Sequence, residues 1–497
     1  MIRNLTILLF SALLILTTFS CRKDNFITDN SAKLSLSQDT VMFDTVFTSV
    51  GSSTELFTVH NNNNKPIKIS SITLGGGLTS PYRLNVDGVP GKSFSDVEIG
   101  PNDSIWIFVE VTIDPHNQNT PFVVSDSIIF QTNHNLQYVH LVAWGQDAHF
   151  HHSLPGDGPL FFIPTNDLTW TNDKPHVIYG YAIVDSGETL SIEQGTNVHI
   201  HPGSGIIVLS SGTLKINGTT INPVTIQGDR LGMDYQDVPG QWDRIWFSNL
   251  THSNLVNGTN EIGPGSKNSV IKNAIIKNGN IGLHIDTVFS PSDVTLRLEN
   301  TIVQTMAGYD LLLRGSVMNA YNCVFANSGL QVTQALYGGT YNFYHCTFAN
   351  FWRNSSRQDP SVNLNNYFGI VVRPLNAYFG NCILYGDLET ELSVDSYPNA
   401  APGLFNFRFD HTIIKAGNNF SLSNPIHYTT VYAARNGQFD PRFVNPDENN
   451  YDLDSASSNA IDKGDQAIVL IDPVLNFDIK NNPRPINLPD LGAYERR

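Results

Sequence analysis

Short runs of alternating apolar and polar residues fill the stretch from residue 34 to residue 148. Examples are ELFTVHN, IKISSITL, SIWIFVEVTI and QYVHLVAWG, which are separated by turn signals such as NNNNKP and IGPND. Alternation with a period of two is typical of strands that bury one face. Roughly six or seven such strands predict a β-sandwich over residues 34–148. We expect Trp106 and Trp144 to lie in the core of this sandwich.

From about residue 160 the runs become shorter, and one word recurs. It reads KNAII, ENTIV, YNCVF, YHCTF, GNCIL and DHTII, and its second residues are Asn273, Asn300, Asn322, His345, Asn381 and His411. The spacing is just over 20 residues, with a few longer intervals. A fixed period of this length predicts a solenoid whose insertions are confined to loops. The word has no helical period and no leucine-rich pattern, so stacked parallel strands are favoured.

Three of the four cysteines occupy the third position of this word. That position holds a small residue in every repeat: Ala274, Thr301, Cys323, Cys346, Cys382 and Thr412. Ala and Thr can neither form a disulfide nor bind a soft metal, and a Cys that alternates with them behaves as a small hydrophobic residue. We therefore predict that these cysteines pack in the interior as free thiols.

The fourth cysteine, Cys21, follows an N-terminal apolar run, LTILLFSALLILTTFS, that is too short for a stable membrane span. The segment TFSC resembles the lipobox of bacterial lipoproteins, and CRKDN is similar to the surface-export signal of Bacteroidetes lipoproteins. The resemblance implies a signal peptide over 1–21, lipidation at Cys21 and a polar tether over 22–33. We expect an outer-membrane lipoprotein of the cell envelope that contacts the membrane through its lipid, with the periplasmic and outer-surface orientations both open.

The charge balance restricts the partners. The chain has 29 basic and 45 acidic residues, a formal net charge of −16. A surface of this sign disfavours nucleic acids and polyanionic sugars as general partners. We expect no nucleic-acid partner, and the sequence leaves the oligomeric state open.

Three stretches resemble the right-handed parallel β-helix proteins of the pectin-lyase-like group. They are SGETLSIEQGTNVHIHPGSGIIVLSSGTLKINGTTINPVTIQG, GQWDRIWFSN, and the C-terminal NYDLDSASSNAIDKGD…DLGAYE. The resemblance implies an all-β chain: a β-helix over 160–440 and a closing segment over 441–497. The stretch FTVHNNNNKPIKISSI is similar to immunoglobulin-like modules, which implies an immunoglobulin-like β-sandwich over 34–148. The His-rich stretch HFHHSLPGDGP at 149–159 is expected to be an interdomain linker.

Catalytic candidates are few. Glycosidases need paired carboxylates and uronide lyases need a base, but the solenoid region has no DD or NTD word. The best candidates are His284, Asp286, Asp310 and Arg314, which fall in corresponding stretches of adjacent coils. We therefore lean against an enzyme. If the protein is one, it is a polysaccharide lyase or a glycoside hydrolase.

The longest interval between repeats, 345–381, favours a binding loop that stands above the solenoid surface. Its candidate ligand-binding residues are Trp352, Arg353, Arg357 and Tyr367, because aromatic rings stack on sugars and Arg donates directed hydrogen bonds. We expect no cofactor and no metal site, with Ca²⁺ at the Asp-rich stretch 445–466 as a minor alternative.

Three functions remain open from the sequence. The favoured one is an envelope lipoprotein whose β-helix binds carbohydrate or another envelope component without cleaving it. The second is a lyase or hydrolase on the same scaffold, and the third is a structural or adhesive surface protein.

Overall fold

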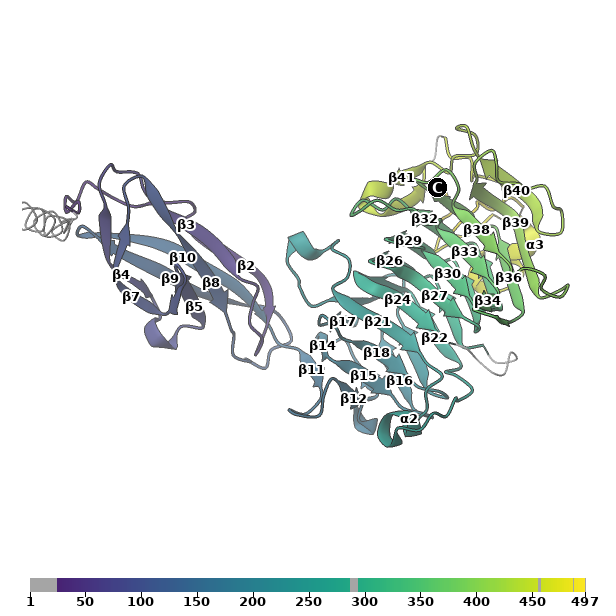
Figure 1. The fold of residues 1–497 in the computed structure, drawn as a ribbon, viewed down its shortest axis with the longest axis horizontal. Helices are drawn as coiled ribbons and strands as arrows, with labels where there is room; N and C mark the ends of the chain where they lie inside the picture. Colours follow the sequence, from purple (N-terminus) through teal and green to yellow (C-terminus); the bar gives the residue numbers. More distant parts are fainter. Residues whose placement is uncertain (1–24, 287–293, 455–456, 486, 497) are drawn as a thin grey trace, which may run out of the picture. The chain divides into compact units, whose positions relative to one another are not determined.

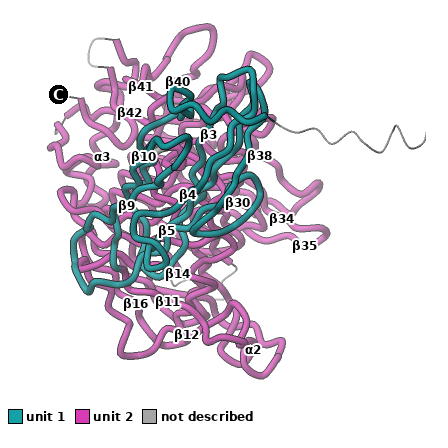
Figure 2. Tube along the Cα trace, turned by 90° about the vertical axis from the view of Figure 1, so that its left-hand side faces the viewer, with its two compact units in different colours: residues 1–147 teal, residues 148–497 magenta. Residues whose placement is uncertain are grey.

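A computed structural model describes residues 25–286, 294–454, 457–485 and 487–496. The chain divides into two compact units, residues 1–147 and 148–497 (Figure 2). The predicted signal peptide and Cys21 lie outside the described residues, so the lipid anchor stays a prediction. No helix among the described residues is both long enough and apolar enough to cross a membrane.

The first unit is a sandwich of two five-stranded sheets, with the strand orders β1-β3-β8-β5-β6 and β2-β10-β9-β4-β7. The inward faces of both sheets form one hydrophobic core, which confirms the β-sandwich predicted from the alternation. Its likeness to immunoglobulin-like modules stays a prediction. The strands are β1 (Ser35–Leu36), β2 (Thr40–Phe47), β3 (Glu55–Asn61), β4 (Ile67–Leu74), β5 (Tyr82–Val86), β6 (Val89–Gly91), β7 (Ser93–Ile99), β8 (Asp103–Val111), β9 (Phe122–Thr132) and β10 (Asn135–Gln146).

The two tryptophans expected in this core point the other way. Trp106 is 49% exposed, and Trp144 is half-buried on the outer face of β10. The reason is the phase of the alternation, since Ile105, Ile107 and Val109 of β8 already occupy the inward positions. The prediction for both side chains was wrong.

The second unit is a parallel β-helix whose coils each contribute strands to three parallel sheets (Figure 1). The first sheet contains β13 (Thr169–Trp170), β16 (Thr189–Glu193), β19 (Thr213–Asn217), β22 (Ser269–Lys272), β25 (Leu296–Glu299), β28 (Val317–Tyr321), β31 (Gly339–Tyr344), β36 (Leu375–Gly380) and the start of β39 (Phe405–Lys415). The second sheet contains β11 (His149–His152), β14 (His176–Tyr179), β17 (Asn197–Ile200), β20 (Val224–Gly228), β23 (Ala274–Lys277), β26 (Ile302–Met306), β29 (Val324–Ser328), β32 (Thr347–Asn350), β37 (Ile383–Gly386), the end of β39, and β40 (Tyr428–Ala434).

The third sheet contains β12 (Leu160–Phe162), β15 (Tyr181–Val184), β18 (Gly205–Val208), β21 (Trp242–Phe247), β24 (Gly279–Ile285), β27 (Tyr309–Arg314), β30 (Thr333–Leu336), β33 (Val362–Asn365) and β38 (Leu392–Asp395). Outside these sheets lie the hairpins β34 (Tyr367–Phe368) with β35 (Val371–Val372) and β41 (Phe443–Asn445) with β42 (Asn450–Leu453). Among the described residues, the helices are α2 (His252–Asn257) and α3 (Gln466–Val469), and the 3-10 turns are η1 (Gly77–Thr79), η2 (Thr165–Asp167), η3 (Met233–Tyr235), η4 (Pro446–Glu448) and η5 (Pro473–Asn476).

The recurring word marks the corner between the first and second sheets. Its Asn or His residue has a positive φ in all six repeats, between 45° and 52°. Asn tolerates this left-handed conformation better than most residues, which is why an amide recurs there. The side chains also form a ladder: the Asn322 amide donates to Asn300 (3.0 Å), and the Asn381 amide donates to Nε2 of His345 (2.8 Å). The predicted solenoid is confirmed.

The three cysteines of the word are free thiols in the interior, as predicted. Cys323, Cys346 and Cys382 have no exposed surface. Each thiol points at the carbonyl oxygen two residues before it, and the hydroxyls of Thr301 and Thr412 make the same contact in their own coils. A small side chain with a weak donor suits this position.

The stretch expected to be a linker belongs to the β-helix. Residues His149–His152 form β11, which pairs in parallel with β14. Two histidines of β11 contact residues of the next coil. His149 lies 3.1 Å from Asp173, and Nε2 of His151 lies 2.8 Å from Nδ1 of His176. The expectation of a linker was wrong for these four residues, because HFHH has a strand partner of matching length. Residues 153–159 form no strand and connect β11 to β12. Among the described residues, no three His, Cys, Asp or Glu side chains gather into a group that could hold a metal ion.

The C-terminal tail packs along the outer face of the second sheet. Apolar tail residues such as Tyr451 and Leu491 cover Val324, Ile383 and Ile413. Polar tail residues seal the corner ladder: the buried guanidinium of Arg484 donates to Asn322 at 2.9 Å and to Glu495 at 2.9 Å.

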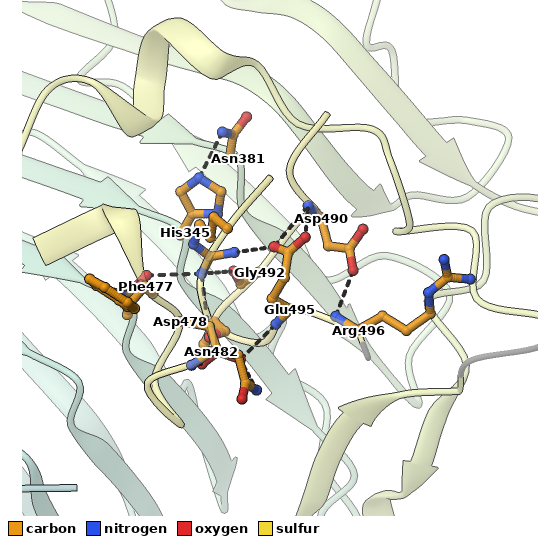
Figure 3. Close-up of polar contacts among 12 residues, drawn as sticks. His345, Asn381, Phe477, Asp478, Asn482, Asp490, Gly492, Glu495 and Arg496 are labelled. Carbon is orange, nitrogen blue, oxygen red and sulfur yellow. Dashed lines mark hydrogen bonds and ion pairs between the residues drawn. The ribbon is translucent and has the colours of Figure 1, made fainter. Parts of the chain in front are cut away.

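Glu495 lies at the centre of this buried polar cluster (Figure 3). Its carboxylate accepts from the backbone of Asp490 at 3.1 Å, and its own backbone N–H donates to Asp478 at 2.9 Å. Burial raises the pKa of Glu495 to about 7, although the Arg484 charge lowers it. The tail therefore covers the later strands of the second sheet, and its residues Val469 and Leu475 also pack on Tyr321 of the first sheet.

Candidate functional site

Three of the four catalytic candidates meet on the outer face of the third sheet, around Asp286. This carboxylate accepts a hydrogen bond from the Trp246 indole at 2.8 Å and lies 3.3 Å from both Nε2 of His284 and a guanidinium nitrogen of Arg314. Burial alone would raise the pKa of Asp286. The neighbouring His284, the hydrogen bond from Trp246 and the Arg314 charge together outweigh burial and lower it. Asp286 is therefore an ionised carboxylate that accepts hydrogen bonds, and it does not serve as a proton donor.

His284 has no nitrogen available for a substrate. Its Nδ1 lies 3.2 Å from Arg244, which can only donate, so Nδ1 accepts and Nε2 carries the proton. Nε2 is buried 3.3 Å from Asp286 without a regular hydrogen bond. The ring also stacks on Trp246, with centroids 5.5 Å apart and planes 5° from parallel. An imidazole whose lone pair is occupied by a guanidinium cannot take a proton from a sugar. The cluster around Asp286 fits a structural role.

Asp310 does not join this cluster, so the predicted four-residue cleft is wrong at that position. It is completely buried and accepts a hydrogen bond from the hydroxyl of Ser328 at 2.7 Å. Ser328 ends β29 in the second sheet, so Asp310 turns to the corner between the sheets, whereas Arg314 points outward. Burial raises the pKa of Asp310 well above its ordinary value and so favours the neutral carboxyl group.

Arg244 and Trp246 are members of the cluster that the sequence analysis missed. They lie in the word GQWDRIWF, where Trp246 is in register with His284 of the next coil. The nearby Asp243 accepts from Arg244 and from the hydroxyl of Tyr181, both at 2.8 Å. Aligning GQWDRIWF with GNIGLHI by coil would have placed these residues side by side.

The expected protruding loop between residues 345 and 381 does not exist as one loop. Its middle forms β33 (Val362–Asn365), a regular strand of the third sheet, because VNLN continues the pairing of β30. Trp352 precedes this strand and donates to Ser355, whereas Tyr367 follows it and donates to Asp395. The two aromatic residues thus lie at opposite ends of β33.

The two arginines of this interval also have separate environments. Arg353 is exposed and pairs with Asp447 at 2.9 Å. Arg357 is buried, with 3% of its side chain exposed, and makes a two-point ion pair with the fully buried Glu391 at 2.6 and 2.8 Å. Arg357 therefore does not stand on a surface loop as expected, because its guanidinium neutralises a carboxylate inside the fold.

A groove of about 270 Å³ lies on the outer face of the first sheet, where β31, β36 and β39 run side by side. Its lining combines three amides, a phenol, a guanidinium and an imidazole with three apolar side chains: Asn342, Asn376, Asn406, Tyr378, Arg408, His427, Ala377, Phe407 and Ile426. Ile426 is 74% exposed. This is the candidate binding groove.

The fold positions these side chains by simple alternation. The six residues that end on the first residue of three successive copies of the recurring word read GTYNFY, LNAYFG and FNFRFD. Phe343, Phe379 and Phe409 point inward as one stacked row, with neighbouring centroids 4.8 and 4.5 Å apart, so the residues between them point out. These positions were not predicted from the sequence, although the outward Asn and Tyr residues recur from coil to coil.

Contacts within the groove fix the side chains without using all their hydrogen-bonding capacity. The Asn406 amide donates to Asn376 at 3.1 Å, Arg408 pairs with Asp410 at 2.8 Å, and His427 stacks on Phe407 with centroids 4.0 Å apart. Burial and the neighbouring Asp410 raise the pKa of Tyr378, so its hydroxyl stays protonated. The groove can therefore both donate and accept hydrogen bonds beside an aromatic ring.

No protein-family profile and no curated protein matches this sequence. Among solved structures, the catalytic unit of the thermostable GH87 alpha-1,3-glucanase of Streptomyces thermodiastaticus aligns over 72% of this chain and 73% of its own, at 12% identity and a TM-score of 0.34. A family 123 glycoside hydrolase from Clostridium perfringens aligns over 23% of this chain and 26% of its own, at 11% identity and a TM-score of 0.17.

The E. coli chaperone DraB aligns over 22% of this chain and 54% of its own, at 13% identity and a TM-score of 0.16. This chain thus spans about a quarter of the length of the family 123 enzyme and about half of the chaperone. At TM-scores below 0.5, these likenesses carry no argument about activity. The architecture rests on the strand pairing described above.

Proposed function

We propose that this protein is a lipid-anchored protein of the cell envelope that binds carbohydrate in the groove of the first sheet without cleaving it. The observation that carries the proposal is the groove itself, a surface hollow lined by Asn342, Asn376, Asn406 and Tyr378. Amides donate and accept at once, as sugar hydroxyls do, and an aromatic ring packs against the apolar face of a sugar. The anchor rests on the TFSC motif at Cys21.

Binding without cleavage is favoured by what surrounds the groove. Asp410, the carboxylate beside Arg408 of the lining, is engaged by Arg408 at 2.8 Å and by His411 at 2.9 Å. Glycoside hydrolysis needs two carboxyl groups on either side of the bond, one of them protonated. The residues that line the groove include no carboxyl group.

The test is retention of the full-length protein, solubilised in detergent, on a panel of immobilised polysaccharides, with the soluble products assayed for new reducing or unsaturated ends. We expect retention without new ends. The double substitution Asn376→Ala with Asn406→Ala should weaken retention about tenfold, because each lost hydrogen bond contributes about 0.5–1.5 kcal/mol.

The matched control is Asn363→Ala, which removes an amide of the same kind from the third sheet, where it donates to Gln334 at 3.1 Å. This variant should bind as the unmodified protein does. New chain ends on any polymer would refute the non-catalytic proposal in favour of a lyase or hydrolase. Absence of retention on every polymer would favour a structural or adhesive role.

A further inference from the structure

We infer that the groove takes a neutral polysaccharide, one without carboxylate or sulfate groups, and that it contacts more than one sugar unit along successive coils. This inference rests on the proposed function and deepens it. Three features of the outer face of the first sheet carry it: the pairing of its charges, the pairing of its amides and the position of its tyrosines.

Three cations of this face already have carboxylate partners. Arg408 pairs with Asp410 at 2.8 Å, as described above. Toward the N-terminus, Arg297 contacts Glu299 and lies 2.9 Å from Asp472, and Lys272 lies 3.1 Å from Glu299. An anionic polymer would have to displace these carboxylates and also approach a chain whose net charge is −16. A neutral polymer meets neither obstacle.

The amides of the face are tied in pairs across neighbouring coils. Asn376 and Asn406 are in register, and so are Asn319 and Asn342. In each pair the later amide nitrogen donates to the earlier amide oxygen, at 3.1 Å and 2.8 Å respectively. Among the described residues, this leaves an N–H donor on the earlier Asn and an oxygen acceptor on the later one without a further partner. The free donor and acceptor lie one coil apart and suit the hydroxyl groups of a neutral sugar.

A stripe of tyrosines runs beside the amides. Tyr321 stacks on Tyr344, with centroids 5.3 Å apart, and Tyr344 lies 5.6 Å from Tyr378. Val469 and Leu475 of the C-terminal tail cover Tyr321, so the open part of the stripe begins at Tyr344. Tyr344 and Tyr378 are half-buried, so part of each ring is open to solvent. Strands in a sheet lie about 4.8 Å apart. Asn342 with Tyr344 on β31 and Asn376 with Tyr378 on β36 place an amide and a ring on each of two adjacent coils, with Tyr378 in register with Asn342. A polymer that lies across these strands contacts both coils.

The experiment measures the affinity of the full-length protein for neutral glucans, mannans and galactans and for the carboxymethylated form of each polymer it retains. We expect carboxymethylation to weaken binding at least tenfold. Raising NaCl from 0.05 to 0.5 M should change the affinity for the neutral polymer less than about twofold, because no ion pair forms. Equal or tighter binding of the carboxymethylated form, or a steep loss of neutral-polymer binding with salt, would overturn the inference and leave carbohydrate binding intact.

Oligosaccharides of increasing length test the extent of the site. Affinity should rise with length, and Asn319→Ala should weaken binding of the longest oligosaccharide at least threefold while leaving the shortest unchanged. Asn363→Ala on the third sheet is the control and should change neither. An affinity that is already maximal for the shortest oligosaccharide would overturn the part of the inference that concerns successive coils. Absence of binding to every polymer would refute the proposed function itself.

Discussion

The buried ion pair between Arg357 and Glu391 gives the sharpest test of the structure, because the sequence favoured a ligand-binding role for Arg357. Glu391 has no exposed surface, and its carboxylate also accepts from the backbone and hydroxyl of Ser361 and from the backbone of Leu388. Removing one member of a buried pair leaves an uncompensated charge, which typically costs about 3–5 kcal/mol. We expect this cost for Arg357→Met and for Glu391→Gln separately.

The double variant should cost clearly less than the sum of the two, since neither charge is then left unpaired. The β-helix has roughly 350 residues, so 3–5 kcal/mol corresponds to a fall in Tm of about 4–7 °C. Differential scanning calorimetry of the four proteins measures this directly, and Arg353→Met, which removes an exposed arginine, serves as the control. Losses below about 1 kcal/mol, or strictly additive losses, would show that Arg357 is not buried against Glu391.

Three further predictions concern the same unit. Burial lowers the pKa of His199 to about 4, whereas the unfolded chain binds this proton near pH 6.5. The contribution of His199 to the free energy of unfolding is therefore full above pH 6.5 and falls by about 3 kcal/mol as the pH drops to 4. His199→Gln should reduce this pH dependence, measured by urea unfolding at pH 7 and pH 4.5. Cys323, Cys346 and Cys382 are buried, and burial raises the pKa of the Cys323 and Cys346 thiols. Iodoacetamide should therefore modify the three cysteines only in urea. Mass spectrometry that finds them alkylated in the native protein would contradict their place in the interior. His284→Phe should lower the Tm and leave polysaccharide retention unchanged, whereas lost retention at unchanged stability would move the binding site to the third sheet.

The fold could be predicted because its demands are local. A corner that needs a left-handed residue recurs once per coil, and Asn273, Asn322 and Asn381 satisfy it, so the solenoid is visible in the spacing alone. The interior cysteines followed from the same alignment. The prediction for the sandwich tryptophans was wrong because it relied on the size of the side chain. The alternation along the strand already places Ile105 and Ile107 inward, which turns Trp106 outward.

The candidate sites were harder to predict because they depend on which coils are neighbours. The stacking of Trp246 on His284 requires the register of two strands separated by the long excursion that contains α2. The burial of Arg357 depends on Glu391, which belongs to the following coil and has no local signal. The groove depends on outward residues of β31, β36 and β39, whose types are ordinary one at a time. Register between coils, rather than composition, assembles these surfaces.

The C-terminal tail also has a consequence for the order in which this chain acquires its structure. Each coil needs only the coil before it, so stacking can proceed as the chain emerges from synthesis or export. The tail instead joins positions far apart in the sequence, as in the contact of Arg484 with Asn322, 162 residues away. Until residues near the C-terminus arrive, Val324, Ile383 and Ile413 present an apolar face to solvent. The arrival of the tail therefore covers the apolar face of coils that formed much earlier. A chain that lacks the tail would have stacked coils with this face exposed and would tend to aggregate.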